Sequence, residues 1–520
     1  MSGGTEPPTT EPVAIVVDLG TGGPKVGLAT LRGKVLWAEH HVVKTVRLPD
    51  GGAEQDADEW WDLVCAGVRR GLTAGVCRPG GVAAVAITGQ WASTVPVDPA
   101  GVPVGPALLW MDTRARKLVR ARFGGPVAGY QPRKVWEYVR RSGGAPSLDG
   151  ADPTGHRMYL QARRRDIWDA ARYLLEPVDY LSMRFTGVAA ASAVSMIASW
   201  LCDTRDPGVT TYDPQLLDLA GVTTAKLPTL HPFGAVVGEV SADVARELDL
   251  PSGVRVVTGC PDLHSAAMGA GAVDDFSAHM ALSTTSWVSC PIVKKKTDVF
   301  HSIASVPGLT PDRYLVANSQ ETAGRSFQWL RDVLNRPGVE ERDYADLTAL
   351  ASTSPPGAGG VIFTPWLDGE RSPIADRFAR AGFHRLSLAT TQADLVRAVM
   401  EGVATNVRWL FQTTEKFVGR RLDPVRLIGG GAASDLWCAI FADVLDRTIE
   451  QVDDPLYCGL RGAALIAGVA LGEIKRSEVG GLVPVRATYR PDPADRVVYD
   501  RAFRAFPKLH ATQKKIFRRK

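Results

Sequence analysis

Apolar runs broken by short polar or glycine-rich segments open the chain. Residues 13–19, 25–31 and 35–40 predict three buried strands, and residues 82–89 form a fully apolar fourth run that stops at a glycine. Between the third and fourth runs the spacing changes to that of a helix. This order of strands, helix and strand predicts an α/β sheet with loops at its strand ends, where ligands tend to bind.

The helix between these strands is predicted over residues 55–72. Its apolar side chains recur every three or four positions, at Trp61, Val64, Val68 and Leu72. Asp56 is the expected N-cap, with Glu59 three residues later.

The rest of the first half is less regular. Residues 123–155 are rich in Gly, Pro and Arg and show a helical period only in VWEYVRR, so we predict an irregular excursion there. Helical spacing returns from Arg157 and continues through residues 166–187. A further apolar run, VRVVTG (residues 254–259), predicts a strand that ends shortly before Asp262.

After Asp274 the strand pattern begins again. HMALSTTSWVSC (residues 279–290) predicts a strand, a hydroxyl-rich turn and a strand, which is also the design of VVDLGTGGPKVGL (residues 16–28). A chain that repeats this device can hold two similar domains facing each other, with a boundary near residues 271–277. Chance similarity between two hairpins is an equal alternative on the pattern alone.

Three more elements are predicted near the end of the chain. RLIGGGAASDLWCAIFADVL (residues 426–445) indicates a strand, a triple glycine and a helix, and CGLRGAALIAGVALG (residues 458–472) a tightly packing small-residue helix closed by Gly472. A long helix with Thr391 and Asp394 as its cap has one apolar face: Leu395, Val399, Val403, Val407 and Leu410.

Composition narrows the classes of function. The 520 residues are 45% hydrophobic and 22% charged with a net charge of +4, which is ordinary for a globular protein and gives no case for nucleic acid. Seven dispersed cysteines without a CxxC pair favour a reducing compartment, and the nine histidines form no ligand-like cluster.

Neither a signal peptide nor a membrane span is predicted. Residues 1–12 are polar and Pro-rich, and no apolar run reaches membrane-spanning length. We therefore expect a cytoplasmic protein with no membrane partner, a disordered segment over residues 1–12, and a solvated, frayed tail at KKIFRRK.

DLGTGGPK, residues 18–25, carries more than a turn requires. Backbone N–H groups of a glycine-bearing turn can converge on phosphate oxygens, Lys25 can neutralise their charge, and Asp18 can hold Mg²⁺. Thr21 offers a hydroxyl at the tip. The alternative is a tight hairpin with an incidental lysine.

Two further segments suit phosphate transfer. The triple glycine of residues 429–431 stands between a strand and a helix, where a nucleotide could approach the backbone and the positive helix end; a close packing corner is the alternative. Asp262 follows a strand and could accept a proton from a substrate hydroxyl. From the residues alone, an N-cap role for a helix over residues 263–270 is favoured, and the two roles are compatible.

TGQWAST (residues 88–94) and LLWMDTRA (residues 108–115) place amide, indole, carboxylate and guanidinium groups at loop ends. Such groups suit a polyhydroxyl ligand, which needs hydrogen bonds and an aromatic face. The alternative is that Trp91 is a core residue and that Asp112 merely pairs with Arg114. Trp110 is expected in the core.

In their order along the chain these segments resemble the FGGY carbohydrate kinases, most closely the xylulokinase branch. EPVDYLSMRFTG, TPWLDGERSP and RGAALIAG add to the resemblance, which runs from about residue 13 to residue 472. It implies an α/β fold of two actin/hexokinase/Hsp70-like (ribonuclease H-like) ATPase domains, each with a five-stranded mixed sheet, and a cleft between them. The implied boundaries are residues 13–273 for the sugar-binding domain, 274–490 for the nucleotide-binding domain and 491–520 for a helical tail.

The resemblance also implies ligands and residue roles. ATP, Mg²⁺ and a small sugar are the expected ligands, with D-xylulose as the leading acceptor, and a homodimer is compatible with the family. By position, Asp262 matches the general base, Asp18 the acidic residue near Mg²⁺, and Gln90, Trp91 and Asp262 the acceptor contacts. The ATP contacts implied by position are Gly20, Thr21, Gly22, Lys25, Thr284, Thr285, Gly430, Gly431, Ala432 and Ser434.

Both phosphate turns depart from the family pattern. Pro24 removes a backbone N–H from the first turn, and Gly22 and Gly23 stand where many relatives carry hydroxyls. In the second turn, Ser283 and Ser286 replace glycines. These changes predict either reshaped turns or slow phosphoryl transfer, so a catalytically weak sugar or nucleotide sensor of the same fold is one alternative function.

The acceptor loop departs most. Xylulokinases typically show GQMHG where this chain has GQWAS, so Trp91 and Ala92 replace the methionine and histidine that meet the pentulose. Another ketose or a polyol is therefore an alternative to D-xylulose. A chaperone- or filament-type ATPase is disfavoured, because Asp262 and the sugar-like loops would have no role in it.

Overall fold

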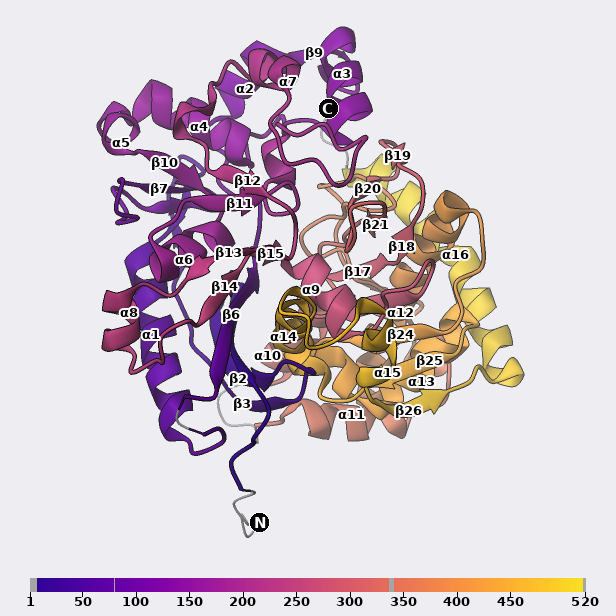
Figure 1. Cartoon of the computed structure of the whole chain (residues 1–520). Coiled ribbons are helices and arrows are strands. Elements are labelled where there is room, and N and C mark those ends of the chain that lie inside the picture. The colour runs from indigo at the N-terminus through magenta and orange to yellow at the C-terminus, as the bar shows by residue number, and fades with distance from the viewer. Residues whose placement is uncertain (1–6, 79, 336–340, 518–520) are drawn as a thin grey trace.

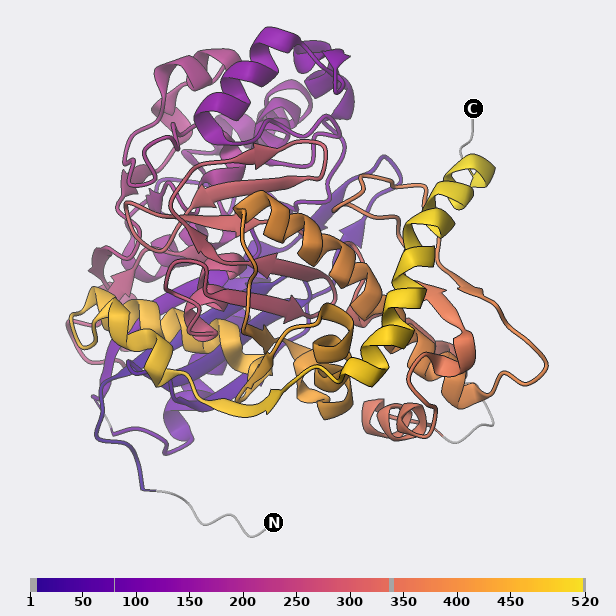
Figure 2. The same cartoon turned by 90° about the vertical axis from the view of Figure 1, so that its right-hand side faces the viewer.

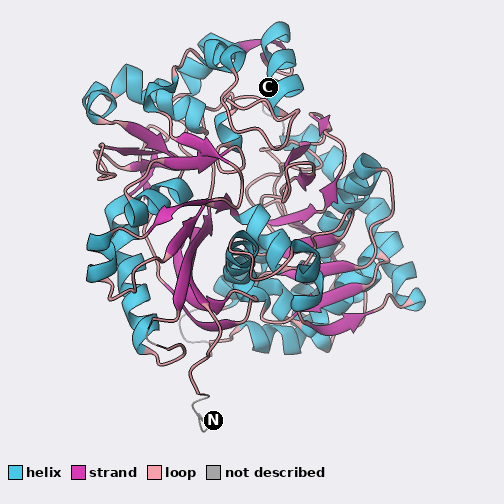
Figure 3. Ribbon diagram, viewed as in Figure 1, coloured by secondary structure: helices cyan, strands magenta, loops and turns pink. Residues whose placement is uncertain are grey.

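The structure is a computed structural model that describes residues 7–78, 80–335 and 341–517 (Figure 1). Its two largest sheets lie in separate lobes, one drawn in indigo to magenta and the other mainly in orange to yellow. Helices α9 (Asp262–Gly269) and α14 (Cys458–Ala470) lie between the two lobes. Figure 3 shows helices flanking both sheets.

The N-terminal sheet has seven strands in the order β13-β14-β6-β1-β2-β3, with the short β15 beside β6. β2 is antiparallel to β1. β1 is parallel to β6, and β6 is parallel to β14, whereas β13 is antiparallel to β14. The expected five strands are therefore too few for this sheet. Its strands are β1 (Val13–Gly20), β2 (Gly23–Thr30), β3 (Val35–His40), β6 (Val82–Gly89), β13 (Val236–Glu239), β14 (Arg255–Val257) and β15 (Cys260–Pro261).

The C-terminal sheet has the five strands that were expected, in the order β17-β16-β24-β25-β26. Its pairing is antiparallel, parallel, parallel and antiparallel, which repeats the pairing of β2-β1-β6-β14-β13. The repeated strand–turn–strand pattern thus belongs to two similarly paired sheets rather than to a chance likeness of hairpins. The strands are β16 (Ala278–Leu282), β17 (Ser286–Ser289), β24 (Val425–Ile428), β25 (Ile449–Val452) and β26 (Val485–Tyr489).

Smaller sheets carry the loops around these two. β4 (Val46–Arg47), β5 (Ala53–Gln55) and β8 (Ala107–Leu108) form one; β7 (Val95–Val97) pairs with β10 (Tyr173–Leu175), and β11 (Ala190–Ser192) with β12 (Thr229–His231). In the second half, β18 (Pro291–Ile292), β19 (Thr297–Asp298), β20 (Ile303–Pro307) and β21 (Tyr314–Ala317) form a sheet, and β22 (Ile362–Thr364) pairs with β23 (Gly382–His384). The short strand β9 spans Gly124–Val127.

The remaining helices surround the sheets. In the first half they are α1 (Ala57–Thr73), α2 (Arg116–Phe123), α3 (Pro132–Ser142), α4 (Pro153–Arg163), α5 (Arg165–Ala170), α6 (Pro177–Thr186), α7 (Pro214–Ala220) and α8 (Ala242–Glu247). In the second half they are α10 (Gly324–Leu334), α11 (Tyr344–Ser352), α12 (Gln392–Val418), α13 (Asp435–Leu445), α15 (Val479–Leu482) and α16 (Pro493–Phe517).

The two faces of the N-terminal sheet differ in side-chain size because residues alternate across a strand. Val13, Ile15 and Val17 pack with residues of α1 and α6, whereas Ala14 and Val16 face the opposite side with residues of α9 and α14. The small residues of α14 therefore allow a helix from the second half of the chain to cover the first sheet.

Helices α9 and α14 cross at direct backbone contacts. A Cβ atom added to Gly462 would lie 1.8 Å from the Ser265 carbonyl oxygen, and one added to Gly269 would lie 2.0 Å from the Cys458 carbonyl oxygen. Only glycine allows such close approach of two helices. The tight packing predicted for this helix is therefore present, and Gly472 follows its end with a φ of +77°.

Helix capping follows the sequence pattern. The Asp56 side chain accepts a hydrogen bond from Asp58 N at the start of α1. Thr391 and Asp394 form a reciprocal capping box at the start of α12. Both predicted N-caps are confirmed.

Two segments of the first half differ from their predictions. Residues 123–155 are not simply irregular, since they hold α3 and the start of α4. Residues 166–187 are divided into α5, β10 and α6, because β10 pairs with β7 and Pro177 begins a new helix. Tertiary pairing thus overrides a local helical spacing.

The ends of the chain are only partly covered by the description. Of residues 1–12, predicted to be disordered, residues 1–6 lie outside the described part, while Thr9 N donates to the Val76 carbonyl at 3.0 Å. Residues 518–520 of the predicted frayed tail also lie outside it, and the chain before them is helical to Phe517 with Lys514 and Lys515 exposed. Figure 2 shows α16 along the outer side of the C-terminal lobe. None of the described helices is both long and apolar enough to span a membrane.

Candidate active site

The β1–β2 hairpin places two opposite charges side by side. Asp18 and Lys25 are directly opposed in the antiparallel register, and Lys25 Nζ lies 3.3 Å from Asp18 Oδ2. The Asp18 side chain is 16% exposed and that of Lys25 is 27% exposed. The Asp18 charge raises the pKa of Lys25 above its usual value, against the opposing effect of burial.

The tip of this hairpin is a two-residue turn formed by Thr21 and Gly22. Gly23 has a φ of +128°, and a Cβ atom there would lie 2.1 Å from the His41 carbonyl oxygen, so only glycine fits. Pro24, opposite Leu19, has no N–H to offer a phosphate.

The Thr21 side chain faces the loop after β6. Its hydroxyl donates to Gln90 Oε1 at 3.2 Å and accepts from Trp110 Nε1 at 3.0 Å. The ATP contact expected of Thr21 stays a prediction, and its side chain already has two protein partners. Trp110 is only half-buried and contacts the turn, so its expected place in the core is wrong.

Asp262 begins α9 beside the end of β6. β15 pairs in parallel with β6 so that Pro261 lies opposite Gly89, and Asp262 and Gln90 therefore follow neighbouring strand ends. Pro261 is the N-cap and Asp262 the first helical residue, with its Oδ1 accepting from Leu263 N at 2.8 Å. The favoured N-cap role of Asp262 is therefore wrong.

The surroundings of Asp262 suit a proton acceptor. Burial, with a further contribution from the negative charge of Asp18, raises its pKa to about 7, while the Leu263 N–H and Lys25 oppose the shift. Conversely, Asp262 adds to the rise in the pKa of Lys25. Asp18, Lys25 and Asp262 thus form one electrostatically coupled group.

The loop after β6 presents the two predicted acceptor residues differently. Gln90 is 5% exposed, and its Nε2 has no hydrogen-bond partner among the described residues. Trp91 is partly buried and packs against an apolar cluster that contains Leu263, the neighbour of Asp262, together with Ile197, Ala267, Val306 and Leu315. A buried amide donor without a partner fits an oxygen-rich ligand.

Asp112 and Arg114 are both engaged by protein groups. Arg114 pairs with Asp112 and with Glu54, both at 2.6 Å, and its guanidinium lies 4.3 Å from the centre of the Tyr159 ring. Asp112 also accepts from Ala53 N at 3.1 Å. These contacts support the alternative in which Asp112 pairs with Arg114.

The β16–β17 hairpin forms the second turn, over Ser283, Thr284 and Thr285. Its carbonyl groups are held by the start of α10, because Gly324 N donates to the Ser283 carbonyl at 2.7 Å and Ala323 N to the Thr284 carbonyl at 3.0 Å. Trp287, three residues past Thr284, packs against the same apolar cluster as Trp91. This cluster joins the second turn to the Asp262 region.

The triple glycine lies directly against the second turn. Gly429 has a φ of +90°, and a Cβ atom there would lie 2.7 Å from both the Leu282 carbonyl oxygen and Ser283 Oγ. At Gly430 a Cβ atom would meet only Leu456, at 4.0 Å, so this glycine has free space. The segment Gly430–Ala433 is a 3₁₀ turn, and Ser434 caps α13 by accepting from Trp437 N at 3.2 Å.

Helix α14 also reaches the first hairpin. A Cβ atom on Gly459 would lie 2.8 Å from Asp18 Oδ2, so the first turn of α14 abuts this carboxylate. The positive end of a helix stabilises a nearby negative charge. Sequence reasoning missed Gly459, although a glycine beside the start of a small-residue helix was the available signal.

The metal prediction can be tested on the donor set. Among the described residues, no group of three or more His, Cys, Asp or Glu side chains could hold a metal ion. Mg²⁺ bound with a nucleotide needs only one or two carboxylates, because phosphate oxygens and water fill the other positions. Asp18 fits that smaller requirement.

Comparison with known families decides the class of protein. The model for the N-terminal domain of the FGGY family of carbohydrate kinases matches residues 13–123 and 152–269, and the model for the C-terminal domain matches residues 273–471. The chain belongs to the FGGY family of carbohydrate kinases. It is an ATP-dependent sugar kinase, and the predicted family is confirmed.

Individual relatives agree with this assignment. This FGGY kinase is 26% identical to the xylulose kinase of Staphylococcus epidermidis over 509 residues, 97% of each chain. The structure of xylulose kinase from Rhodospirillum rubrum is similar with a TM-score of 0.81 and 26% identity, covering 98% of this chain and 100% of the other.

A gluconate kinase shares the fold as well. The structure from Lactobacillus acidophilus gives a TM-score of 0.83 at 21% identity, over 97% of this chain and 99% of the other. The FGGY kinase therefore has the predicted two-domain actin/hexokinase-like fold.

Proposed function

We propose that this FGGY kinase transfers the γ-phosphoryl group of ATP to a primary hydroxyl of a small sugar, with D-xylulose as the leading acceptor. The observation that carries the proposal is the coupled group of Asp18, Lys25 and Asp262, in which the pKa of Asp262 is raised to about 7. A carboxylate with such a pKa is well matched to proton transfer near neutral pH.

Asp262 acts as the general base. Its carboxylate accepts the proton of the acceptor hydroxyl while that oxygen forms a bond to the γ-phosphorus and the bond from phosphorus to the ADP oxygen breaks. The protonated Asp262 later releases its proton to solvent. Because Asp262 follows β15 and Gln90 follows β6, the base and the acceptor loop are held at neighbouring strand ends.

Positive groups stabilise the charge that develops on the phosphoryl oxygens. Lys25 provides an ammonium, and the backbone of the first turn (Gly20, Thr21 and Gly22) and of the second turn (Thr284 and Thr285) provides N–H donors. Asp18 would hold Mg²⁺, which supplies charge neutralisation to the phosphates when bound. Gly430, Gly431, Ala432 and Ser434 would bind the adenosine side, since this segment lies against the second turn.

The acceptor binds between Gln90 and Trp91. The unpartnered Nε2 of Gln90 donates to a sugar oxygen, and the Trp91 indole offers a flat apolar face. Since an indole occupies more space than the usual methionine, another small ketose or a polyol is the alternative acceptor. The likeness to both xylulose and gluconate kinases supports a polyhydroxylated acceptor without selecting one.

A substrate panel tests this proposal. Purified protein with Mg-ATP is offered ketopentoses, ketohexoses, aldonates and polyols, and ADP release is measured by a coupled assay. We expect at least one small sugar or polyol to raise ADP release above the rate with ATP alone, and NMR of the product to place phosphate on a primary carbon. ADP release that no acceptor increases would contradict the proposal.

A further inference from the structure

The acceptor loop, residues 90–94, contains a backbone conformation that a non-glycine residue adopts only under restraint. Ala92 has a φ of +60°, in the left-handed region. It stands between Trp91 and Ser93, so its conformation sets the direction of Trp91 relative to the anchored part of the loop. The groups that hold Ser93 therefore decide where Trp91 lies.

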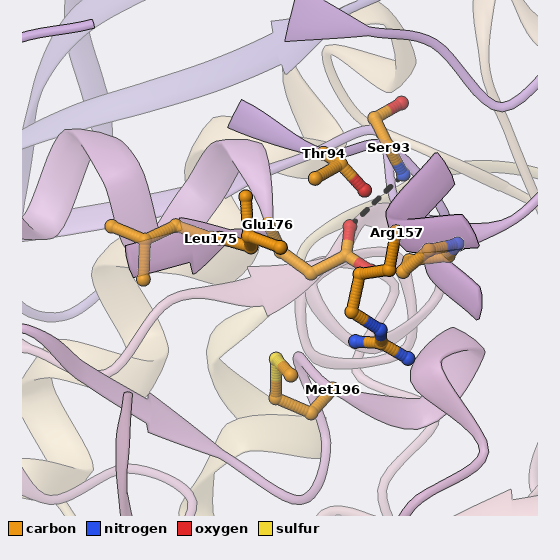
Figure 4. A pocket seen from close by; sticks show the side chains of 8 residues that line it. Ser93, Thr94, Arg157, Leu175, Glu176 and Met196 are labelled. Atoms are coloured by element: carbon orange, nitrogen blue, oxygen red, sulfur yellow. Dashed lines mark hydrogen bonds between the residues drawn. The ribbon is translucent and has the colours of Figure 1, made fainter. Parts of the chain in front are cut away.

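One of these groups is the buried carboxylate of Glu176. Its Oε2 accepts a hydrogen bond from Ser93 N at 3.1 Å, as Figure 4 shows. Glu176 is 2% exposed and follows β10, whose pairing with β7 brings Leu175 opposite Val95. The pairing of β10 with β7 therefore places Glu176, which follows β10, beside the acceptor loop, which precedes β7.

The Glu176 side chain does not cap α6 by a hydrogen bond, although Glu176 is the residue before that helix. Its Oε1 has no hydrogen-bond partner among the described residues. Among the described residues, this buried acid therefore accepts its hydrogen bond from the loop amide of Ser93 and not from its own helix.

The environment of Glu176 is closed: burial and then the nearby Asp179 raise its pKa well above the ordinary value, against the opposing effects of the Ser93 N–H and Arg157. Ser93, Thr94, Arg157 and Met196 line the narrow pocket around it, together with Pro153, Leu174 and Leu175 (Figure 4). Arg157 is 3% exposed and donates to Thr154 Oγ1 and the Ser199 carbonyl, so its guanidinium is fixed beside the acid. Burying an acid costs free energy that hydrogen bonding offsets, so the bond from Ser93 N–H matters for this site.

We propose that Glu176 is a positioning residue for the sugar acceptor: by holding Ser93 N–H it keeps the strained loop at Ala92 in the conformation that directs Gln90 and Trp91 to the acceptor. This rests on the proposed function, in which Gln90 and Trp91 meet the acceptor. Glu176 itself acts through the loop and does not contact the reacting atoms.

Two substitutions separate the reach of the side chain from its acid group. Glu176→Gln keeps the length and a carbonyl acceptor for Ser93 N–H, whereas Glu176→Asp keeps the acid but withdraws it by one methylene. We expect Glu176→Asp to raise the acceptor KM about tenfold, since the lost hydrogen bond is worth roughly that factor. We expect Glu176→Gln to stay within about twofold of wild type, and neither variant to change kcat or the ATP KM.

Relieving the backbone strain at Ala92 should restore the acceptor KM of Glu176→Asp. A Glu176 that only stabilised the fold would not show this rescue. Glycine adopts a φ of +60° without cost, so Ala92→Gly in the Glu176→Asp background should return the acceptor KM toward wild type. Ala128→Gly in the same background is the matched control, because Ala128 also has a positive φ, +50°, and is exposed. It should give no rescue.

Hydrogen–deuterium exchange measures the anchor independently of turnover. The peptide covering residues 88–95 should exchange slowly in wild type and in Glu176→Gln, and faster in Glu176→Asp. If no acceptor in the panel is phosphorylated, the proposed function fails, and exchange still decides whether Glu176 anchors the loop.

Three results would overturn the inference. They are fast exchange of the Ser93 amide in wild type, an acceptor KM in Glu176→Asp equal to that of wild type, and equal impairment of Glu176→Gln and Glu176→Asp. The first needs no variant, so the inference stays testable even if a substituted chain fails to fold.

Discussion

The hairpins β1–β2 and β16–β17 hold equivalent places in two similarly paired sheets, yet they carry different chemistry. Asp18 and Lys25 are opposed on the face of the first hairpin that lies toward α9 and α14, and on the corresponding face of the second hairpin Ala281 is opposed to Trp287. Ala281 is buried and Trp287 packs against two apolar clusters, whereas Asp18 and Lys25 carry opposite charges. The same backbone scaffold therefore holds an ion pair in one copy and an apolar pair in the other.

The helices that cross between the lobes repeat this contrast. Asp262 is the first residue of α9, and Cys458 is the first residue of α14. The charged groups Asp18, Lys25 and Asp262 thus gather in the first copy. The second copy offers mainly backbone, at the turn of residues 283–285 and at the glycines 429–431, and we infer a division between chemistry in the first lobe and nucleotide binding in the second.

Removing the base should break this contrast most strongly. Asp262→Asn is expected to lower kcat by about 10²–10⁴-fold, as is typical for loss of a general base, with ATP binding largely retained. The coupled ADP assay gives kcat, and calorimetry gives the ATP affinity. Cys458→Ser, at the equivalent position of α14, should leave kcat nearly unchanged; retained turnover in Asp262→Asn would contradict the assignment.

Replacing the cation of the first hairpin should have the next largest effect. Lys25→Met makes this pair more like the apolar pair of the second hairpin and removes a charge that stabilises the phosphoryl oxygens. We expect kcat/KM for ATP to fall about 10²-fold, the size seen when one stabilising donor is lost. Lys294→Met is the control, since Lys294 is exposed on another strand connection. An unaltered kcat/KM would place Lys25 outside the phosphate site.

The pH dependence of kcat/KM should show the electrostatic coupling between Asp18 and Asp262 in the first copy. Asp262 must be deprotonated to accept a proton, so kcat/KM should fall as the pH drops through about 7. Because the negative charge of Asp18 raises the pKa of Asp262, Asp18→Asn should move this acid limb to lower pH, whatever its effect on the absolute rate. A limb that stays in place would show that Asp18 and Asp262 are not coupled.

The smallest effect is expected in the second copy. Ser434→Ala removes the N-cap of α13 next to the glycine loop and should cost about 1 kcal/mol of stability. We expect the ATP KM to rise about threefold, because the cap orders the loop with the energy of one hydrogen bond. Ser241→Ala, which removes the N-cap of α8, should lower stability without changing the ATP KM.

Local patterns predicted much of the scaffold. The opening strands, the second hairpin and the caps of α1 and α12 depend on alternation, glycines and side chains a few residues apart, all of which are visible in the sequence. The division of residues 166–187 could not be predicted in this way, because the pairing of β10 with β7 decides it.

The contacts of the site were predictable only in part. Asp18 and Lys25 are opposed in a short hairpin, so their proximity follows from local pairing. Glu176 and Ser93 are 83 positions apart, and the half-buried place of Trp110 depends on a hydrogen bond to Thr21. Such long-range contacts depend on how separate elements pack, so the spacing of residues along the chain does not predict them.

The cover that α14 provides for the first sheet affects the order in which this chain can fold. The strands β1 and β6 leave the ribosome long before residues 458–470, which complete the packing over Ala14 and Val16. During synthesis that small-residue face of the first sheet therefore stays exposed, and exposed apolar surface favours aggregation. A fragment cut between the two family-model matches should be prone to aggregate, and mixing both fragments should restore solubility by supplying the missing helix.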